Sequence, residues 1–585
     1  MNRYSNIETR RNFYQRAILA LCTGLALLTM SSLVIAGTYH IDDDEDWSDL
    51  SPQPTAADII YIYDEAELTV DVNNAVCAAI YIGYNNGSGD EEGSLQFDDS
   101  NSQLTVYGVA GVTLGSSNGE GTLDMDDGGT LITPSITVLH SGSEFDHGKG
   151  TVILTAHNTL PTEFSTFKHL VIYAGTTVLG RDIKVKGDLS INGTLDVSTS
   201  NHEIVLKGDW INNGTFVQGQ GLVVLEGSNL QTITGSGATV FNSLELNTKG
   251  KGKGKGKGKG NGNGGQPNGV LLAVPTYVQG VFELTQGVLY SDSINYVTLG
   301  PLATTLGGSD ASYVDGRIKI ETDTIKSIVI GTGKNGKQKK TALSTSSTDP
   351  SVFILEYFDQ PHPGSGNLTS GLDHICDMQY WEMTRVSGTA DAAISLFWDN
   401  TTCTPMDLLP ALKVARFDTA QWISEGNSSL SGDPNFGSIT SNTLSAFGCF
   451  TFGCEHSGLR TSGIEDNFIG PPDFSSQKVN LESENTLSQV EMEHNARVAI
   501  YELDMAVTPN PSMGKMNITI RDRVGEEVLI VVQDMLGRAH YSKVIFPHNS
   551  EFHLAVDPSK KLEPGVYMII GSSDNRLYKK KVVIQ

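Results

Sequence analysis

Short runs of alternating apolar and polar residues recur along much of the chain, and glycine or asparagine separates them. The segments Gly121–Asp124, Gly193–Asp196 and Gly214–Val217 share one pattern, and an asparagine precedes the second and third of them. The step from Gly193 to Gly214 has the size of one coil of a solenoid. A single coil buries its inner face only against the next coil, so such repeats stack into a continuous core. We therefore expect a parallel β-helix over residues 37–311, right-handed by analogy. A tandem of β-sandwiches is the alternative.

The pattern changes after residue 311, where glycine becomes rarer and longer aromatic strands appear. We expect a β-sandwich over residues 312–455. Pairing Trp381 with Trp398 in one hairpin brings Cys376 opposite Cys403, and directly opposed residues lie within disulfide reach. The sequence therefore predicts a Cys376–Cys403 disulfide. An exposed Trp381 or Trp398 would make this region a glycan-binding module.

The first 36 residues predict an export signal. Three arginines, at positions 10, 11 and 16, precede the apolar stretch Ala17–Leu28, and Ala36 is a small residue where a signal peptidase would cut. An uncleaved membrane anchor is the alternative, because residues 17–36 are about long enough to span a bilayer. Cleavage would leave a mature chain without a transmembrane anchor, in a compartment where disulfides persist.

The last 85 residues alternate like several short strands joined by tight turns. Pro509, Asn510 and Pro511 open this segment. Gly537 lies in a turn between two strand-like runs, and Gly565 follows a proline before Tyr567. The strand count predicts an immunoglobulin-like sandwich over residues 501–585.

These motifs, together with the closing lysine-rich strand around Lys580, resemble the type A C-terminal sorting domain of type IX secretion substrates from Bacteroidetes-like bacteria. The resemblance implies that the type IX secretion machinery is a partner and that the protein travels through the periplasm to the outer cell surface or the medium. It also implies removal of the domain, followed by attachment to surface lipopolysaccharide or release. An ordinary carbohydrate-binding sandwich is the alternative.

Two segments of biased composition divide the rest of the chain. Residues 249–265 begin with a strict Lys-Gly alternation, which predicts an extended, flexible loop, or alternatively a tether for anions. Residues 456–500 are polar and acidic and predict a linker.

Composition narrows the functional classes. Glycine supplies 63 of the 585 residues, only 18% are charged, and the formal net charge is −27. High glycine and low charge suit an all-β protein with many turns, and the negative charge disfavours nucleic acid as a partner.

One set of residues is similar to the catalytic elements of polygalacturonase-type β-helix hydrolases: Asp126-Asp127, His147-Gly148 and Arg317-Ile318-Lys319. The Asn-Thr-Asp element of that family is missing, and residues 147 and 317 fall many coils apart. We therefore predict no catalytic, cofactor or metal site. The interpretation is a secreted or surface protein, non-enzymatic and adhesin- or scaffold-like, with lipopolysaccharide or an extracellular glycan as ligand. The alternative is a polysaccharide-active or glycan-binding secreted β-helix protein.

Overall fold

The protein is described by a computed structural model of the 585-residue chain. The structure describes residues 36–584 apart from 86, 88–90, 250–268, 400–408, 410, 456–500 and short turns of the last domain (503–504, 510–515, 522–527, 535–538, 546, 548, 557–564 and 574–575). The chain forms two compact units, Met1–Ser462 and Gly463–Gln585. The export signal up to residue 35, the Lys-Gly tract from residue 250 and the linker 456–500 lie outside the described residues.

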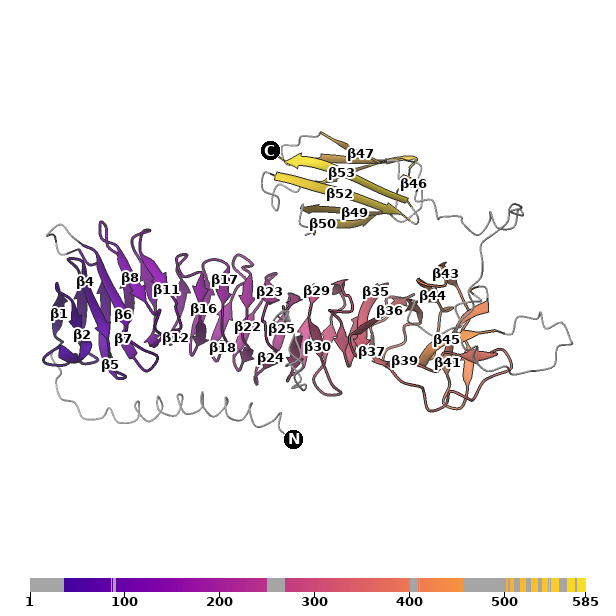
Figure 1. Ribbon diagram of the computed structural model, residues 1–585, viewed down its shortest axis with the longest axis horizontal. Helices are drawn as coiled ribbons and strands as arrows, with labels where there is room; N and C mark the ends of the chain where they lie inside the picture. The colour runs from indigo at the N-terminus through magenta and orange to yellow at the C-terminus, as the bar shows by residue number, and fades with distance from the viewer. Residues whose placement is uncertain are drawn as a thin grey trace, which may run out of the picture. The chain divides into compact units, whose positions relative to one another are not determined.

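The first unit is a parallel β-solenoid of about thirteen turns, which confirms the predicted fold class (Figure 1). One sheet runs along the whole solenoid and receives one strand from each coil, paired in parallel with the strands before and after. These strands are β1 (Thr38–Ile41), β3 (Ile59–Ile62), β5 (Ala75–Ile82), β7 (Gln103–Leu114), β9 (Thr130–Thr133) with β10 (Ile136–Val138), β12 (Thr151–Leu154), β15 (His169–Ile172), β18 (Leu189–Ile191), β21 (Trp210–Asn212), β24 (Gln231–Thr234), β27 (Gly269–Leu272), β30 (Val288–Tyr290) and β33 (Val314–Asp315).

The remaining faces of the coils change along the solenoid. The first coils have two faces, and their second sheet is formed by β2 (Glu45–Asp46), β4 (Ala66–Val70), β6 (Gly93–Phe97), β8 (Gly121–Asp124) and β11 (Glu144–Asp146). Later coils have three. One further face holds β13 (Asn158–Leu160), β16 (Thr176–Leu179), β19 (Thr194–Asp196) and β22 (Thr215–Val217), then β25 (Thr239–Phe241), β28 (Thr276–Val278), β31 (Val297–Leu299) and β34 (Ile318–Thr322). The other holds β14 (Thr166–Phe167), β17 (Ile183–Val185), β20 (Ile204–Leu206), β23 (Leu222–Leu225), β26 (Ser243–Asn247), β29 (Val281–Gln286) and β32 (Thr304–Gly307).

The predicted repeat register is the observed one. Thr194 pairs with Thr215 in the next coil, as expected from the shared pattern. At the preceding corner, Asn213 donates from Nδ2 to Oδ1 of Asn192 over 3.1 Å. A Cβ atom on Gly214 would lie 2.0 Å from the carbonyl oxygen of Gly193, so only glycine allows this approach between coils. The Asn-Gly pairs therefore mark a corner where successive coils approach each other closely.

Inward-facing apolar side chains stack from coil to coil and form the core. Leu170, Leu189, Trp210 and Ile233 occupy one position on four successive strands, and none of them is exposed to solvent. Burying one such side chain contributes about 1.5–3 kcal/mol, so each coil is stabilised mainly by contact with its neighbours. At the first coil, Trp47 lies in the 3₁₀ turn η1 (Trp47–Asp49) and is 1% exposed, so its indole covers the start of this core.

Residues 312–455 continue two solenoid sheets with antiparallel strands. The long sheet gains β35 (Ser327–Lys334), β36 (Lys337–Thr345), β40 (Ala392–Trp398), β43 (Ser429–Gly432) and β44 (Gly437–Thr440). The sheet that contains β34 gains β37 (Ser351–Phe358), β38 (His374–Ile375), β39 (Tyr380–Ser387), β41 (Leu412–Phe417), β42 (Trp422–Ser424) and β45 (Gly448–Cys454). One hydrophobic core runs from Ile41 to Cys454, so the boundary predicted at 311/312 falls within continuous sheets.

The predicted hairpin between Trp381 and Trp398 is wrong. β39 pairs with β37 and β45, whereas β40 pairs with β36 and β44 in the other sheet. Residues 388–391 therefore carry the chain from one sheet to the other instead of turning within one sheet. Both tryptophans face the interior, and each contacts the ring of Phe452, with centroids 5.9 Å and 6.2 Å away.

The second unit packs two sheets around its own core. A five-stranded sheet contains β46 (Tyr501–Glu502), β49 (Val528–Asp534), β50 (Ala539–Ile545), β52 (Gly565–Ser573) and β53 (Arg576–Ile584). A three-stranded sheet contains β47 (Met505–Thr508), β48 (Met516–Arg521) and β51 (Glu551–Val556). Alternating apolar residues from both sheets, such as Ile518, Ile530 and Ile569, form one buried cluster.

Candidate functional site

The second unit places three predicted signature residues on two neighbouring strands, Gly565 and Tyr567 on β52 and Lys580 on β53. β52 and β53 are antiparallel, with Gly565 opposite Ile584 and Tyr567 opposite Val582. Tyr567 is buried, so its ring belongs to the core of the unit. Pro509 directly follows β47 and is exposed. Asn510, Pro511 and Gly537 lie outside the described residues.

The last strand presents Lys580 and Lys581 to solvent. Along β53, Tyr578, Val582 and Ile584 are buried at alternate positions on one face. Lys580 has the same parity but is exposed, and Lys581 is exposed on the opposite face. The strand therefore combines an apolar face for packing with positive charge that stays in water.

The hairpin predicted around Gly537 is confirmed by its strands. β49 and β50 are antiparallel, and Val532 pairs with Tyr541.

Residues 506–585 match the family model for the secretion system C-terminal sorting domain. The chain thus carries a type IX sorting domain. No curated protein matches the chain.

The sorting domain defines where the protein acts. Its presence indicates export by the type IX secretion machinery to the cell surface or to the medium. Among the described residues, no helix is long and apolar enough to cross a membrane. The part of the chain before the sorting domain is the exported passenger.

The passenger does not assemble the residues that resemble a polygalacturonase site. Asp126 and Asp127 follow β8 and are exposed, and the following coil places Lys149 Nζ 3.3 Å from Asp127 Oδ1. His147 follows β11, whereas Arg317 lies between β33 and β34. Eight coils at a strand spacing of ~4.8 Å separate these two residues by roughly 38 Å. An acid and a base acting on one glycosidic bond must lie within about 10 Å of each other.

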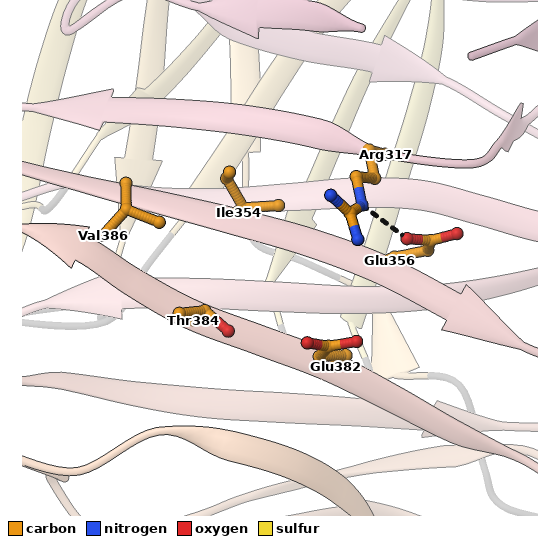
Figure 2. A pocket seen from close by; sticks show the side chains of 6 residues that line it. All are labelled: Arg317, Ile354, Glu356, Glu382, Thr384 and Val386. Atoms are coloured by element: carbon orange, nitrogen blue, oxygen red, sulfur yellow. Dashed lines mark hydrogen bonds and ion pairs between the residues drawn. The ribbon is translucent and has the colours of Figure 1, made fainter. Parts of the chain in front are cut away.

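Arg317 has a different partner. Its Nε donates to Oε2 of Glu356 over 2.8 Å, and Glu356 lies directly opposite Glu382 on the neighbouring strand (Figure 2). The pairing with Glu356 raises the pKa of the Arg317 guanidinium. Together with Ile354, Thr384 and Val386, these side chains line a shallow surface pocket. Here one guanidinium neutralises one of two adjacent carboxylates, so the pocket retains negative charge.

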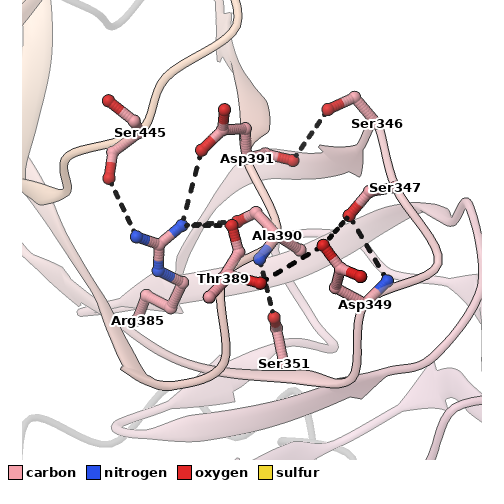
Figure 3. A network of polar contacts seen from close by, with 9 residues as sticks. All are labelled: Ser346, Ser347, Asp349, Ser351, Arg385, Thr389, Ala390, Asp391 and Ser445. Atoms are coloured by element: carbon pink, nitrogen blue, oxygen red, sulfur yellow. Dashed lines mark hydrogen bonds and ion pairs between the residues drawn. The ribbon is translucent and has the colours of Figure 1, made fainter.

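Arg385, between two residues of this pocket, ties the sheet to the crossing loop (Figure 3). Its Nη1 donates to the carbonyl oxygens of Thr389 and Ala390 at 3.1 Å and 2.7 Å, and its Nη2 donates to that of Ser445 at 3.0 Å. The guanidinium carbon also lies 5.2 Å from the ring centroid of Phe447. The planar fork of arginine matches these three acceptors, which lysine cannot reach together.

We expect Arg385→Lys to lower the free energy of unfolding of the passenger by about 1–3 kcal/mol, because hydrogen bonds made by a charged group are lost. Urea denaturation of the full chain measures this change. The matched control is Lys337→Ala, which removes an ion pair between Lys337 and Asp310 that is about half exposed on both sides. The control should change stability by less than about 1 kcal/mol. Equal effects of the two variants would contradict a role for the guanidinium fork.

Trp381 and Trp398 cannot serve as sugar platforms. They are 0% and 4% exposed. Trp381 donates from Nε1 to Oγ1 of Thr332 at 3.3 Å, and Trp398 donates from Nε1 to the carbonyl oxygen of Asp433 at 2.8 Å. The burial of both rings counts against the alternative of a glycan-binding module built on an exposed tryptophan, because two inward-facing strand positions place both rings in the core.

An aromatic ladder on the outer face of the first three coils was not expected from the sequence. We define it as His40, Tyr61, Tyr63, Tyr81 and Tyr84. His40 pairs with Tyr61, and Tyr61 with Tyr81, on successive strands. Their ring centroids are 5.3 Å and 5.1 Å apart with nearly parallel planes, and Tyr84 packs against Tyr61 at 4.3 Å. The signal was present as Ile-Tyr-Ile at residues 60–62 and again at residues 80–82, one coil later.

The ladder offers hydroxyl groups to solvent. Within the described chain, no protein group hydrogen-bonds to the hydroxyls of Tyr61, Tyr81 and Tyr84. Burial, with smaller contributions from Tyr81 and Tyr84, raises the pKa of Tyr61, so its hydroxyl remains protonated at neutral pH. Because stacked rings cover each other's faces, the ladder presents mainly ring edges and phenolic hydroxyls.

The cysteines give a partial answer to the disulfide prediction. Cys376 is disulfide-bonded. Cys403 lies outside the described residues, so its pairing with Cys376 stays a prediction. The hairpin between Trp381 and Trp398 that suggested this pairing is not formed. Cys77 is a fully buried thiol.

In the described ranges, no group of three or more His, Cys, Asp or Glu side chains is arranged to hold a metal ion.

Proposed function

We propose that the passenger is a non-enzymatic adhesin or scaffold that type IX secretion delivers to the outside of the cell. The observation that supports this role most directly is the single core from Ile41 to Cys454. About thirteen stacked turns at ~4.8 Å form a rod roughly 60 Å long, which suits the display of a repetitive surface rather than the enclosure of a substrate.

The aromatic ladder favours an extracellular glycan as the ligand. It lies at the end of the solenoid that contains β1, opposite the end from which the segment towards the sorting domain leaves at Glu455 (Figure 1). If the protein is held at the surface through that segment, the ladder is the part of the solenoid farthest from the attachment. Phenolic hydroxyls both donate and accept hydrogen bonds, so they suit the hydroxyl groups of a sugar.

A glycan array, followed by a turnover assay on every glycan bound, tests this role with the full mature chain. We expect binding without cleavage. Tyr61→Ala combined with Tyr81→Ala should weaken binding by about tenfold or more, because hydrogen bonds from the phenolic hydroxyls to the sugar, worth about 0.5–1.5 kcal/mol each, are lost.

The matched control is Tyr107→Ala. Tyr107 lies on β7 of the same sheet and is 53% exposed, but it is not part of the ladder. Binding unaffected by the ladder variant would remove the ladder from the proposal. Depolymerisation that Asp127→Asn abolishes would replace the adhesin role with polysaccharide cleavage.

A further inference from the structure

A buried carboxylate lies beside the start of the first coil. Asp58 directly precedes β3 and is 5% exposed. Its Oδ2 accepts hydrogen bonds from the backbone nitrogen and the Oγ1 of Thr55 at 2.7 Å and 2.8 Å. Its Oδ1 accepts one from the backbone nitrogen of Gly37 at 2.6 Å.

Asp58 is ionised but has no cation beside it. Burial alone raises the pKa of this carboxyl group, but the hydrogen bonds from Thr55 and Gly37 outweigh burial and hold the pKa below its usual range. Within the described residues, no lysine, arginine or histidine side chain forms an ion pair with it. A buried charge without a counter-ion is costly, so a charge that compensates it would be strongly favoured.

Gly37 is placed to provide that charge. Its nitrogen belongs to the peptide bond that would be cut by cleavage after Ala36. A Cβ atom on residue 37 would lie 2.9 Å from Oδ1 of Asp58, so the absence of a side chain allows the close approach of this nitrogen. Hydrolysis adds the OH of water to the carbonyl carbon of Ala36 and a hydrogen to the nitrogen of Gly37. The new amine takes up a proton at neutral pH, because an α-amino group has a pKa of about 7.7–8.0.

We propose that Asp58 is the binding site for the α-ammonium group of the mature N-terminus, so that removal of the export signal locks the first coil of the solenoid. The proposal rests on the predicted cleavage after Ala36. The nitrogen that now donates 2.6 Å from Oδ1 is the one that becomes charged, so the ion pair forms without movement of the chain.

The lock acts on the edge of the solenoid. The carbonyl oxygen of Gly37 accepts a hydrogen bond from the backbone nitrogen of Ile59 at 3.0 Å, and Thr38 pairs with Ile59 where β1 joins β3. β1 has a partner strand on one side only among the described strands. Fixing Gly37 therefore holds the strand that is easiest to detach, and processing strengthens this hold by adding a positive charge to a hydrogen bond that is already present.

The ion pair gives the first coil a distinct pH dependence. An ammonium group that gains a carboxylate partner has a raised pKa, so its stabilisation is complete from the lowered pKa of Asp58 up to about pH 7.7 and is lost as the pH rises through the folded-state pKa of the amine. In the part of the chain that the structure describes, the other titratable groups that feel the charge of Asp58 are Tyr39 and Cys77. Burial, and then the charge of Asp58, raises the pKa of both, so both stay neutral where the amine begins to titrate.

Hydrogen exchange compares two full-length mature chains, one that begins with the free amine of Gly37 and one that retains Ala36 in front of it. At pH 7 we expect the backbone amides of β1 and β3 to exchange about tenfold or more slowly in the chain that begins at Gly37. The ratio between the two chains should approach one above about pH 10. It should also approach one at pH 7 when both carry Asp58→Asn, whereas Asp71→Asn, at an exposed acceptor for Ser48, should leave it unchanged.

Equal exchange in the two chains at pH 7 would overturn the proposal, and that comparison requires no substitution in the core. N-terminal sequencing of the exported protein tests the premise separately. A mature chain that begins at Gly37 supports it, and one that begins elsewhere overturns both the cleavage site and the lock. Neither result bears on glycan binding, so the proposed adhesin role can fail or hold independently.

Discussion

Deletion of residues 501–585 is expected to abolish delivery of the passenger to the outside of the cell, with the shortened chain retained in the periplasm. The deleted residues include the whole match to the sorting domain and both of its sheets. The passenger has its own core, separate from that of the sorting domain, so it should still fold and resist proteolysis. Immunoblotting of periplasm, outer membrane and medium measures the effect.

A point variant separates recognition from folding of the sorting domain. Lys580→Glu reverses an exposed charge on β53 without removing a core side chain, so it should reduce export while the domain remains folded. The control is Glu551→Gln on β51, which removes a largely exposed ion pair with Arg521 and should leave export unchanged. Normal export of the chain without residues 501–585 would contradict the assignment of the address to this domain.

Trp210→Ala is expected to give the largest loss of passenger stability, about 3–5 kcal/mol in the free energy of unfolding. The indole is completely buried, and its ring centroid lies 4.9 Å from those of Phe216 and Phe241, both in edge-to-face geometry. Trp210 also stands in a stack that links successive coils. A cavity there weakens the contact between neighbouring coils, which is the interaction that holds a solenoid together. Denaturant titration of the full chain measures the loss.

Trp210→Phe is the matched control. The indole Nε1 is buried and has no hydrogen-bond partner in the described structure, so phenylalanine loses volume but no hydrogen bond. We expect its cost to be about half that of the alanine variant or less. Equal losses for the two variants would show that the ring contacts at this position do not carry the stability.

Local spacing was enough to predict the repeating part of the fold. The Asn-Gly pairs at residues 192–193 and 213–214 stack as expected, because a coil of fixed length repeats the same backbone constraint. The hairpin before and after residues 535–538 was also predictable, because both strands and their turn are contiguous in sequence. The tyrosine ladder was readable in principle, since the Ile-Tyr-Ile triplet recurs one coil later.

Other features depend on contacts between residues far apart in the chain. The alternation around Trp381 and Trp398 fits a hairpin as well as two facing sheets, and only the pairing with β45 and β44 decides between them. The separation of His147 from Arg317, by contrast, was predictable, because coils of fixed length fill the sequence between the two motifs.

The solenoid, its coil length and the sorting domain could all be predicted before the structure, because each follows from short-range periodicity or from motifs within one contiguous segment. Long-range contacts were needed for three other features: which sheet each strand of residues 312–455 joins, which aromatic rings face solvent, and the contact between the nitrogen of Gly37 and the carboxylate of Asp58. These features depend on how neighbouring coils and facing sheets pack. An alternation of apolar and polar residues looks the same in every strand of the sequence, and only a partner that covers one face shows which residues are buried.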